Sequence, residues 1–169
     1  VNLGTGHFKT TDTLMLPRGA LQYASAALMG TSMWATRINY SGARDRAVVR
    51  ADKRSYTHLG HFALFGDTND RGTSLGLQIL AQTGSGTQNT GVLVHPIWVY
   101  GFDVGVQMGN LTGRAASEHI YEQVIAQNCN YGVKLDSANT LNLVFHFLSA
   151  SACGRGLYTS TAGSVFVGA

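Results

Sequence analysis

"NCNYGVKL", residues 128–135, is the central copy of a phrase that occurs three times in the chain. The other copies are "GFDVGVQM" at 101–108 and "ASACGRGLYT" at 150–159. In each copy a glycine precedes an alternating run, and a phenylalanine or cysteine lies three residues before that glycine. The glycines are Gly105, Gly132 and Gly156, and Gly76 in "LGLQIL" lies 29 residues before Gly105. A repeat of this kind predicts an array of stacked turns.

Alignment of the copies on these glycines produces columns of similar residues. The columns are Leu77, Val106, Val133 and Leu157; Ile79, Met108, Leu135 and Thr159; Leu93, Ile120 and Val144; Ile97, Val124 and Leu148; and Val99, Ala126 and Ala150. Their shared parity predicts strands with one face in a core, stacked about 4.8 Å apart. The fold expected is an all-β, single-stranded, right-handed parallel β-helix (a solenoid). Phe102, Cys129 and Cys153 would stack inside it, and the glycine after each would turn the corner.

The composition favours many short strands joined by tight turns. Only 12% of the 169 residues are charged, 21 are glycine and two are proline, which disfavours a helical bundle. The length suits one domain over residues 1–169, with the first strand and a short N-terminal cap in 1–35 and stacked coils in 36–169. Because the chain starts with Val and stops inside the apolar phrase "SVFVGA", we expect it to be a fragment of a longer chain.

Several classes of partner are disfavoured by charge and hydropathy. The net charge of +3 is small and scattered, so we expect no nucleic-acid partner and interpret the basic run at 44–54 as a solvated turn. No apolar run approaches the length of about 18 residues that spans a bilayer, so no membrane span is expected. Two cysteines make no disulfide framework. "DTND" at 67–70 has too few oxygen ligands for a calcium loop, and we expect no metal and no cofactor.

Two stretches near the N-terminus resemble a known superfamily. "GHFKTTDTLMLPRGALQ" at 6–22, followed by "GTSMWATRINYSG" at 30–42, is similar to the first segment of pectate-lyase-like right-handed parallel β-helices. The matching residues are Gly6, Phe8, Leu14, Leu16, Pro17, Gly19, Gly30 and Thr31, with Ile38 later than usual. The downstream coils resemble the same superfamily, which includes phage tailspikes and polysaccharide depolymerases.

The resemblance implies a phage tailspike-like domain that binds or depolymerises a polysaccharide as a homotrimer, on a virion tail or in another extracellular setting. If the chain is an enzyme, the reaction implied is polysaccharide hydrolysis or β-elimination. The alternative is a non-catalytic structural or adhesive shaft, because this scaffold carries both kinds of protein. The paired-Asp motif of polygalacturonases and the "R-x-P-x-x-R" motif of pectate lyases are absent, so no catalytic residue is carried over from the superfamily.

Two carboxylates are candidate catalytic residues, Glu122 and Asp103. The alignment places Glu122 in one column with His95 and His146, and their parity with Ile97 predicts a buried polar ladder. Such a ladder is structural if Glu122 compensates its histidines, whereas the same groups could hold a metal or make one histidine a general base. The columns of Asp103 and Glu122 lie eight positions apart, too far to meet across one glycosidic bond.

The outward positions supply the candidate ligand-binding residues. Gln78, Gln107, Lys134 and Tyr158 form one outward column, followed by Asp136 two residues beyond Lys134, and this column offers donors and one ring face to a sugar. Its alternative is an ordinary solvated face. Trp98 and Tyr100 point outward too, as a sugar-stacking platform, a surface covered by a loop, or part of a subunit interface. The interface interpretation adds the neighbouring columns Val94, Tyr121 and Phe145, and Pro96 and Phe147, all expected to point outward.

Overall fold

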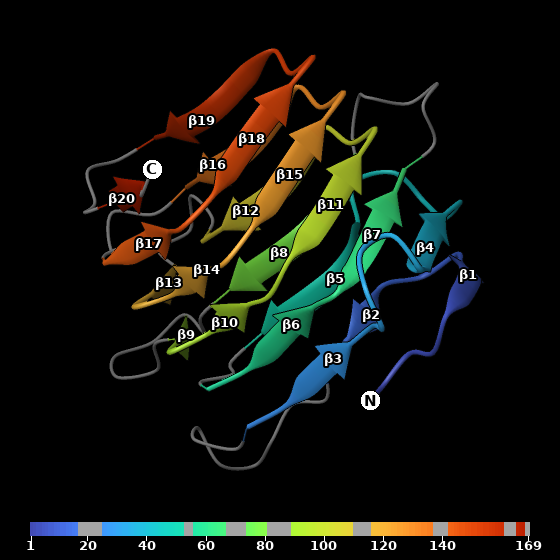
Figure 1. The fold of residues 1–169 in the computed structure, drawn as a ribbon. Helices are drawn as coiled ribbons and strands as arrows, with labels where there is room; N and C mark the ends of the chain where they lie inside the picture. Colours follow the sequence, from blue (N-terminus) through green and yellow to red (C-terminus); the bar gives the residue numbers. More distant parts are fainter. Residues whose placement is uncertain are drawn as a thin grey trace.

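A computed structural model describes residues 1–16, 25–52, 56–66, 74–80, 89–109, 116–136, 142–160 and 165–167. Within these residues every regular element is a β-strand, and none is a helix. The strands form three parallel sheets, which the chain visits in turn as it winds into a β-solenoid (Figure 1). The predicted all-β parallel solenoid is therefore confirmed. No helix of the length and apolar character that cross a membrane occurs in the described part of the chain.

Each sheet contains six described strands, and we name the sheets A, B and C. Sheet A contains β3 (Ala27–Met29), β6 (His58–Gly60), β10 (Leu93–Val94), β14 (Ile120–Tyr121), β17 (Leu143–Phe145) and β20 (Val165–Val167). Sheet B contains β1 (Gly6–Thr10), β4 (Thr36–Tyr40), β7 (Phe62–Phe65), β11 (Ile97–Tyr100), β15 (Val124–Gln127) and β18 (Leu148–Ser151). Sheet C contains β2 (Leu14–Met15), β5 (Ala47–Asp52), β8 (Leu75–Leu80), β12 (Val104–Met108), β16 (Tyr131–Leu135) and β19 (Arg155–Thr159).

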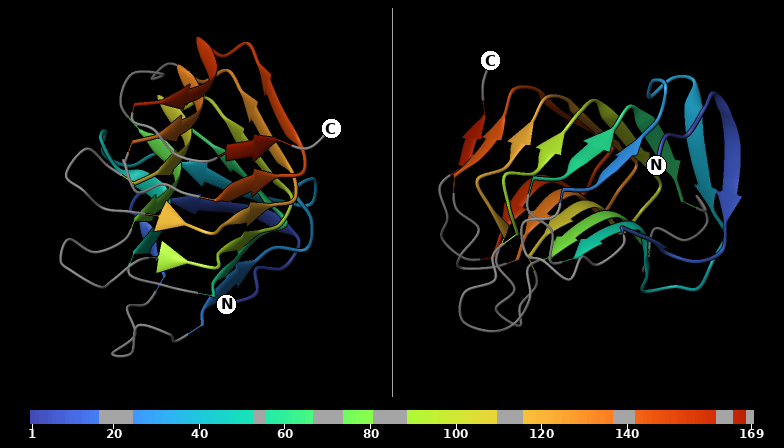
Figure 2. Two further views of the ribbon diagram at one scale, coloured as in Figure 1. Left: turned by 90° about the vertical axis from the view of Figure 1, so that its left-hand side faces the viewer. Right: turned by 90° about the horizontal axis from the view of Figure 1, so that it is seen from below.

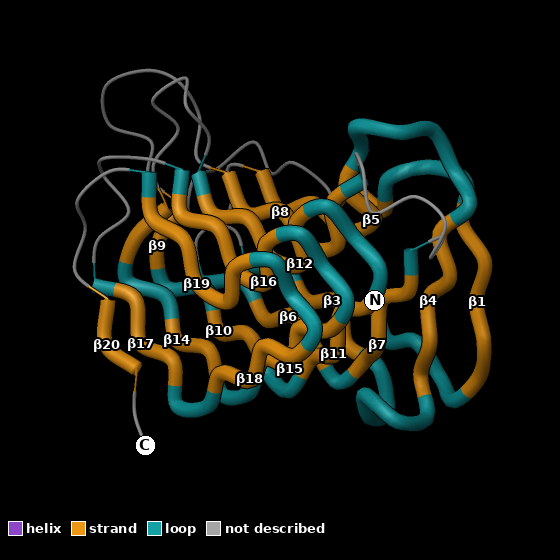
Figure 3. The backbone as a smooth tube through the Cα atoms, turned by 90° about the horizontal axis from the view of Figure 1, so that it is seen from above, coloured by secondary structure: helices purple, strands orange, loops and turns teal. Residues whose placement is uncertain are grey.

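A further short pair joins β9 (Asn89–Thr90) to β13 (Ala116–Ser117). The sheets stack their strands in order along one axis, as the views in Figure 2 show from two further directions. β1 lies at one end of this axis, and β17 and β20 lie toward the other (Figure 3). Residues 17–24, in the predicted cap, and residues 67–70, the "DTND" turn, fall outside the described residues.

The register of the strands confirms the predicted columns. In sheet C, Val106 pairs with Leu77 on one side and with Val133 on the other, and Val133 pairs with Leu157. In sheet B, Val124 lies between Ile97 and Leu148. The interior column of Phe102, Cys129 and Cys153 is also present. The Asn130 amide donates to the Phe102 carbonyl, and the Gly154 amide donates to the Cys129 carbonyl one coil further on. The period read from the sequence thus fixes which residues stack on which.

The direction in which side chains point was predicted wrongly for one sheet. In sheet A the column Val94, Tyr121 and Phe145 is fully buried, and the Tyr121 and Phe145 rings stack at 4.5 Å inside the solenoid. Conversely Ile120, expected in the core, is 43% exposed. The reason is a corner at His95–Pro96, which separates β10 from β11 and resets the alternation, so parity in sheet B does not extend into sheet A.

The repeated glycines do not turn corners, which is a second correction. Positive φ at the corner between sheets B and C belongs to Gly101, Asn128 and Ala152 instead. A Cβ on Gly105 would lie 2.7 Å from the carbonyl oxygen of Gly132, and a Cβ on Gly132 would lie 2.7 Å from that of Gly156. These positions therefore need glycine because successive coils approach closely there.

Candidate functional site

The corner between sheets B and C carries an open hollow of about 370 Å³. It is lined by Asp103, Asn130, Tyr131, Gly154 and Arg155. Backbone hydrogen bonds stack these residues on successive coils: the Tyr131 amide donates to the Asp103 carbonyl (2.8 Å) and the Arg155 amide to the Asn130 carbonyl (2.8 Å). The solenoid therefore brings together side chains that are about two dozen residues apart in sequence.

The hollow combines a carboxylate, an amide, a guanidinium and the phenol ring of Tyr131, and the Tyr158 ring packs beside it. The Asn130 Nδ2 donates to Asp103 Oδ1 at 2.9 Å. The Arg155 guanidinium lies over the Tyr158 ring at 4.8 Å and over the Tyr131 ring at 5.6 Å, and the two rings are 5.3 Å apart. No ion pair joins Asp103 to Arg155 in the described residues, and both charged residues line the hollow.

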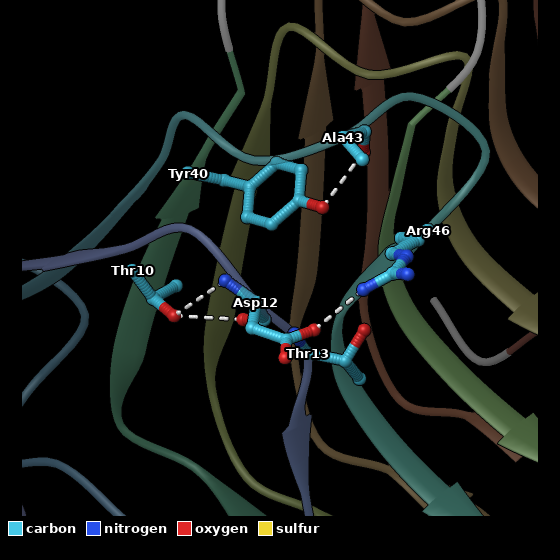
Figure 4. A network of polar contacts seen from close by, with 6 residues as sticks. All are labelled: Thr10, Asp12, Thr13, Tyr40, Ala43 and Arg46. Carbon is cyan, nitrogen blue, oxygen red and sulfur yellow. Dashed lines mark hydrogen bonds and ion pairs between the residues drawn. The ribbon is translucent and has the colours of Figure 1, made fainter.

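The same corner is closed nearer the N-terminus by a polar network (Figure 4). Arg46 contacts Asp12 at 2.9 Å, and the Thr13 amide donates to Asp12 Oδ1 at 2.8 Å. The Thr13 hydrogen bond and then the Arg46 charge hold the pKa of Asp12 below its usual value. The Tyr40 hydroxyl donates to the Ala43 carbonyl at 2.8 Å. On the first coils Asp12 and Arg46 therefore form an ion pair, whereas Asp103 and Arg155 in the hollow do not.

The predicted polar column on sheet C is in register but its side chains bind one another. Gln78 Nε2 donates to Gln107 Oε1 at 2.6 Å, Gln107 Nε2 donates to Asp136 Oδ2 at 2.8 Å, and Lys134 Nζ contacts the same oxygen at 3.0 Å. Gln107 and Asp136 are buried. This column therefore joins coils to one another, and Tyr158, at its end, contacts Tyr131 and Arg155 of the hollow.

The predicted ladder of His95, Glu122 and His146 lies at the corner between sheets A and B and is not buried as a whole, although the His95 side chain is only 17% exposed. His95 Nδ1 lies 3.1 Å from Glu122 Oε2, and the Glu122 side chain is 39% exposed. His146 is exposed as well. The physical reason is the reset of parity at the His95–Pro96 corner, which turns this column outward. His58 extends the ladder, with its Nδ1 3.2 Å from His95 Nε2. In the described residues no group of three or more His, Cys, Asp or Glu has the geometry to hold a metal.

Asp103 and Glu122 are not brought together. Glu122 follows β14 at the corner between sheets A and B, whereas Asp103 precedes β12 at the corner between sheets B and C. A strand of sheet B separates these corners, and four residues of strand span roughly 13 Å. An acid and a base that cleave one glycosidic bond lie at most about 9.5 Å apart. These two carboxylates therefore cannot act as one catalytic pair.

Trp98 and Tyr100 point outward from sheet B, within a cluster of aromatic rings. The Phe65 ring lies 5.0 Å from Trp98 and 5.4 Å from Tyr100, and Trp34 lies 5.3 Å from Trp98. The apolar surface predicted beside them as a subunit interface is smaller than expected, because Val94, Tyr121 and Phe145 point inward. Of the other predicted column, Phe147 is exposed and Pro96 is partly buried.

The two cysteines lie in the interior column and are free thiols. Burial raises the pKa of the Cys129 thiol to about 12, and Cys153 is only partly buried. Neither cysteine lines the hollow, so neither is placed to act as a nucleophile there.

Sequence reasoning identified Asp103 and Tyr158 but missed Asn130, Tyr131 and Arg155. The glycine alignment contained a signal for them. Asn130, like Asp103, lies two residues before a repeated glycine, and Tyr131 and Arg155, like Val104, lie one residue before one. Comparison of the chain with protein-family models, with curated proteins and with solved structures gives no match. The solenoid therefore rests on the structure alone, and the pectate-lyase-like or tailspike type stays a prediction.

Proposed function

We propose that this β-solenoid binds an extended polysaccharide at the corner between sheets B and C. The observation that carries the proposal is the hollow that Asp103 and Arg155 both line without forming an ion pair. Sugars are bound by planar polar side chains that donate and accept hydrogen bonds to several hydroxyls, beside an aromatic ring that covers a ring face. The hollow supplies the polar side chains through Asp103, Asn130 and Arg155 and the aromatic ring through Tyr131, with Tyr158 packed beside it.

The proposal is for binding without cleavage by Asp103 and Glu122, because the two carboxylates lie at different corners. A non-catalytic adhesive shaft is the form of the function that this geometry favours. The bonded column of Gln78, Gln107 and Asp136 supports that form, since it joins neighbouring coils to one another. The homotrimer and the virion-tail or extracellular location stay predictions, and sedimentation equilibrium tests the first of them.

The test is a screen of polysaccharides followed by titration of the one that binds. Replacement Asn130→Ala is expected to weaken binding about 3- to 10-fold, as the loss of one neutral hydrogen bond does. Arg155→Ala is expected to weaken it about 10- to 100-fold because a charged donor is lost. Lys9→Ala, which removes a cation from the exposed face of β1, is the control and should bind like the wild type.

Viscosity of the bound polymer, followed over hours, separates binding from cleavage. Binding without loss of viscosity is the expected result. A bound polymer whose affinity does not change in the Asn130 and Arg155 variants would show that the hollow is not the site.

A further inference from the structure

Four aromatic side chains form a platform on the outer face of sheet B: Trp34, Phe65, Trp98 and Tyr100. The register places Trp98 beside Ala63 and Tyr100 beside Phe65 on adjacent strands. Ala63 is small and points outward, yet it is only 1% exposed, so it forms a covered floor between Trp98 and Arg37, its partner on the other side. The platform contains both tryptophans of the chain.

The polar atom of Trp98 is not satisfied in this arrangement. Its indole Nε1 is buried and has no hydrogen-bond partner among the described residues. A buried N–H without an acceptor costs free energy, because water bonded to it in the unfolded chain and nothing replaces that bond. An acceptor that reached this N–H would recover the lost interaction.

Trp34 is placed to uncover Trp98. It lies in the turn before β4, it is 70% exposed, and its ring rests on Trp98 at 5.3 Å with a tilt of 54°. Its amide donates to the Ser32 Oγ of the same turn, at 3.3 Å. Rotation of this one exposed side chain would free the face of Trp98 without disturbing the sheet beneath it.

The rim of the platform is polar. The Arg37 guanidinium lies 3.6 Å from the centre of the Phe65 ring, and Arg37 Nε donates to Asn39 Oδ1 at 2.7 Å. The guanidinium carries four further N–H donors besides this Nε–H. An aromatic face, a buried N–H donor and a cationic rim match a pyranose ring, which has an apolar C–H face and a rim of hydroxyl and ring oxygens.

We infer that Trp98 is a sugar-stacking subsite covered by Trp34: a glycan displaces Trp34, one pyranose ring packs on the face of the Trp98 indole, and a hydroxyl oxygen of the neighbouring sugar accepts a hydrogen bond from Nε1, whose N–H lies in the plane of the indole. The inference rests on the proposed glycan-binding function and assigns a second subsite to the same ligand. The two surfaces share one coil, because Tyr100 ends β11 of the platform and Asp103, which lines the hollow, precedes β12.

Intrinsic fluorescence tests this inference directly, because Trp34 and Trp98 are the only tryptophans in the chain. The probes are six-sugar oligosaccharides from cellulose, xylan, chitin, dextran and polygalacturonate, titrated into the wild type. The expected result is a shift in emission on binding, together with loss of the exciton-coupled circular dichroism that two indoles in contact produce. Binding without any change in either signal would overturn the inference.

Three variants separate stacking, donation and covering. Trp98→Ala should weaken binding at least about 10-fold, and Trp98→Phe, which keeps a ring but lacks the donor, about 3- to 10-fold. Trp34→Ala should bind at least as tightly as the wild type, since no side chain has to be displaced. Wild-type affinity in Trp98→Phe, or a Trp34→Ala variant more than about threefold weaker than the wild type, would overturn it. Far-ultraviolet circular dichroism confirms that each variant is folded.

The failures of the two proposals can be told apart. If Arg155→Ala loses binding while both Trp98 variants keep it, the hollow binds glycan and the platform does not. If no oligosaccharide or polymer binds the wild type, both proposals fall. If Trp34→Ala converts an oligomer to a monomer in sedimentation equilibrium, the platform is a contact between copies of the chain, and the sugar subsite is excluded.

Discussion

Replacement of Gly105 by Ala tests whether the close approach of coils is what selects glycine in the repeat. A Cβ at this position would lie 2.7 Å from the Gly132 carbonyl oxygen and 2.7 Å from Val99 Cγ2. Gly105 has no positive φ, so the backbone conformation itself accepts alanine. Any cost therefore comes from contact with the next coil and the core.

The magnitude follows from these two contacts. Overpacking of a well-filled interior costs about 1–3 kcal/mol, and displacement of the Gly132 peptide weakens hydrogen bonds worth about 1 kcal/mol. Alanine restricts the unfolded chain, which offsets about 0.4–1 kcal/mol. We therefore expect Gly105→Ala to lower the free energy of unfolding by about 2–3 kcal/mol, or the urea midpoint by about 1 M at a typical m value.

Gly156→Ala is the matched control, because among the described residues a Cβ there would meet only the Ala150 Cβ, at 3.3 Å. It should change the free energy of unfolding by less than about 1 kcal/mol. Gly132→Ala separates the effect of close approach from that of distance to the C-terminal end of the solenoid. Gly132 lies one coil from Gly156, but a Cβ on Gly132 would lie 2.7 Å from the Gly156 carbonyl oxygen. Urea unfolding of all three should place Gly132→Ala beside Gly105→Ala. Equal costs in all three variants would refute the close-approach argument, and a steady decline from Gly105 to Gly156 would refute it in favour of fraying at the end of the solenoid.

Two further predictions concern ionisable groups. At pH 8, iodoacetamide followed by mass spectrometry should modify Cys153 much faster than Cys129, whose buried thiol has a pKa of about 12; equal rates would contradict the interior placement of Cys129. Asp12→Asn should lower the thermal melting temperature slightly at neutral pH. A lowered carboxyl pKa contributes stability at pH values above the unfolded pKa of 3.8, and this stability is lost as the pH falls through the folded pKa. The melting temperatures of wild type and variant should therefore converge in acid, and a difference that persists there would exclude ionisation of Asp12 as the cause.

The stacking of the coils could be predicted from the sequence because it depends on period alone. Gln107 pairs with Gln78 and Lys134 in the structure, as the glycine alignment requires. The same alignment could not show that Gln107 and its neighbours would bond to one another. That outcome depends on side-chain rotamers and on Asp136, which lies two residues beyond the column.

The orientation of sheet A could not be predicted in the same way. Alternation is reliable only within one strand, and β10 contains two residues before the chain turns at Pro96. Two residues are too few to reveal which face is inside, so parity was extended from β11 across the corner. Trp34 was missed for a related reason: it lies in a turn, where no period applies, and its contact with Trp98 joins different coils.

The position of the candidate sites at and beside a corner follows from how a solenoid is built. Interior columns such as Val106 and Val124 are packed against one another and cannot reach a ligand. On the outer face of sheet C, stacking in register places similar polar groups side by side, so Gln78, Gln107 and Asp136 hydrogen-bond to one another, although Asp136 Oδ1 has no partner among the described residues. At the corner the backbone turns, and groups of opposite charge such as Asp103 and Arg155 line one hollow without forming a pair. Additional strands in the sheets would therefore add columns whose polar side chains hydrogen-bond to one another, whereas substitutions at the corner residues would alter what the solenoid binds.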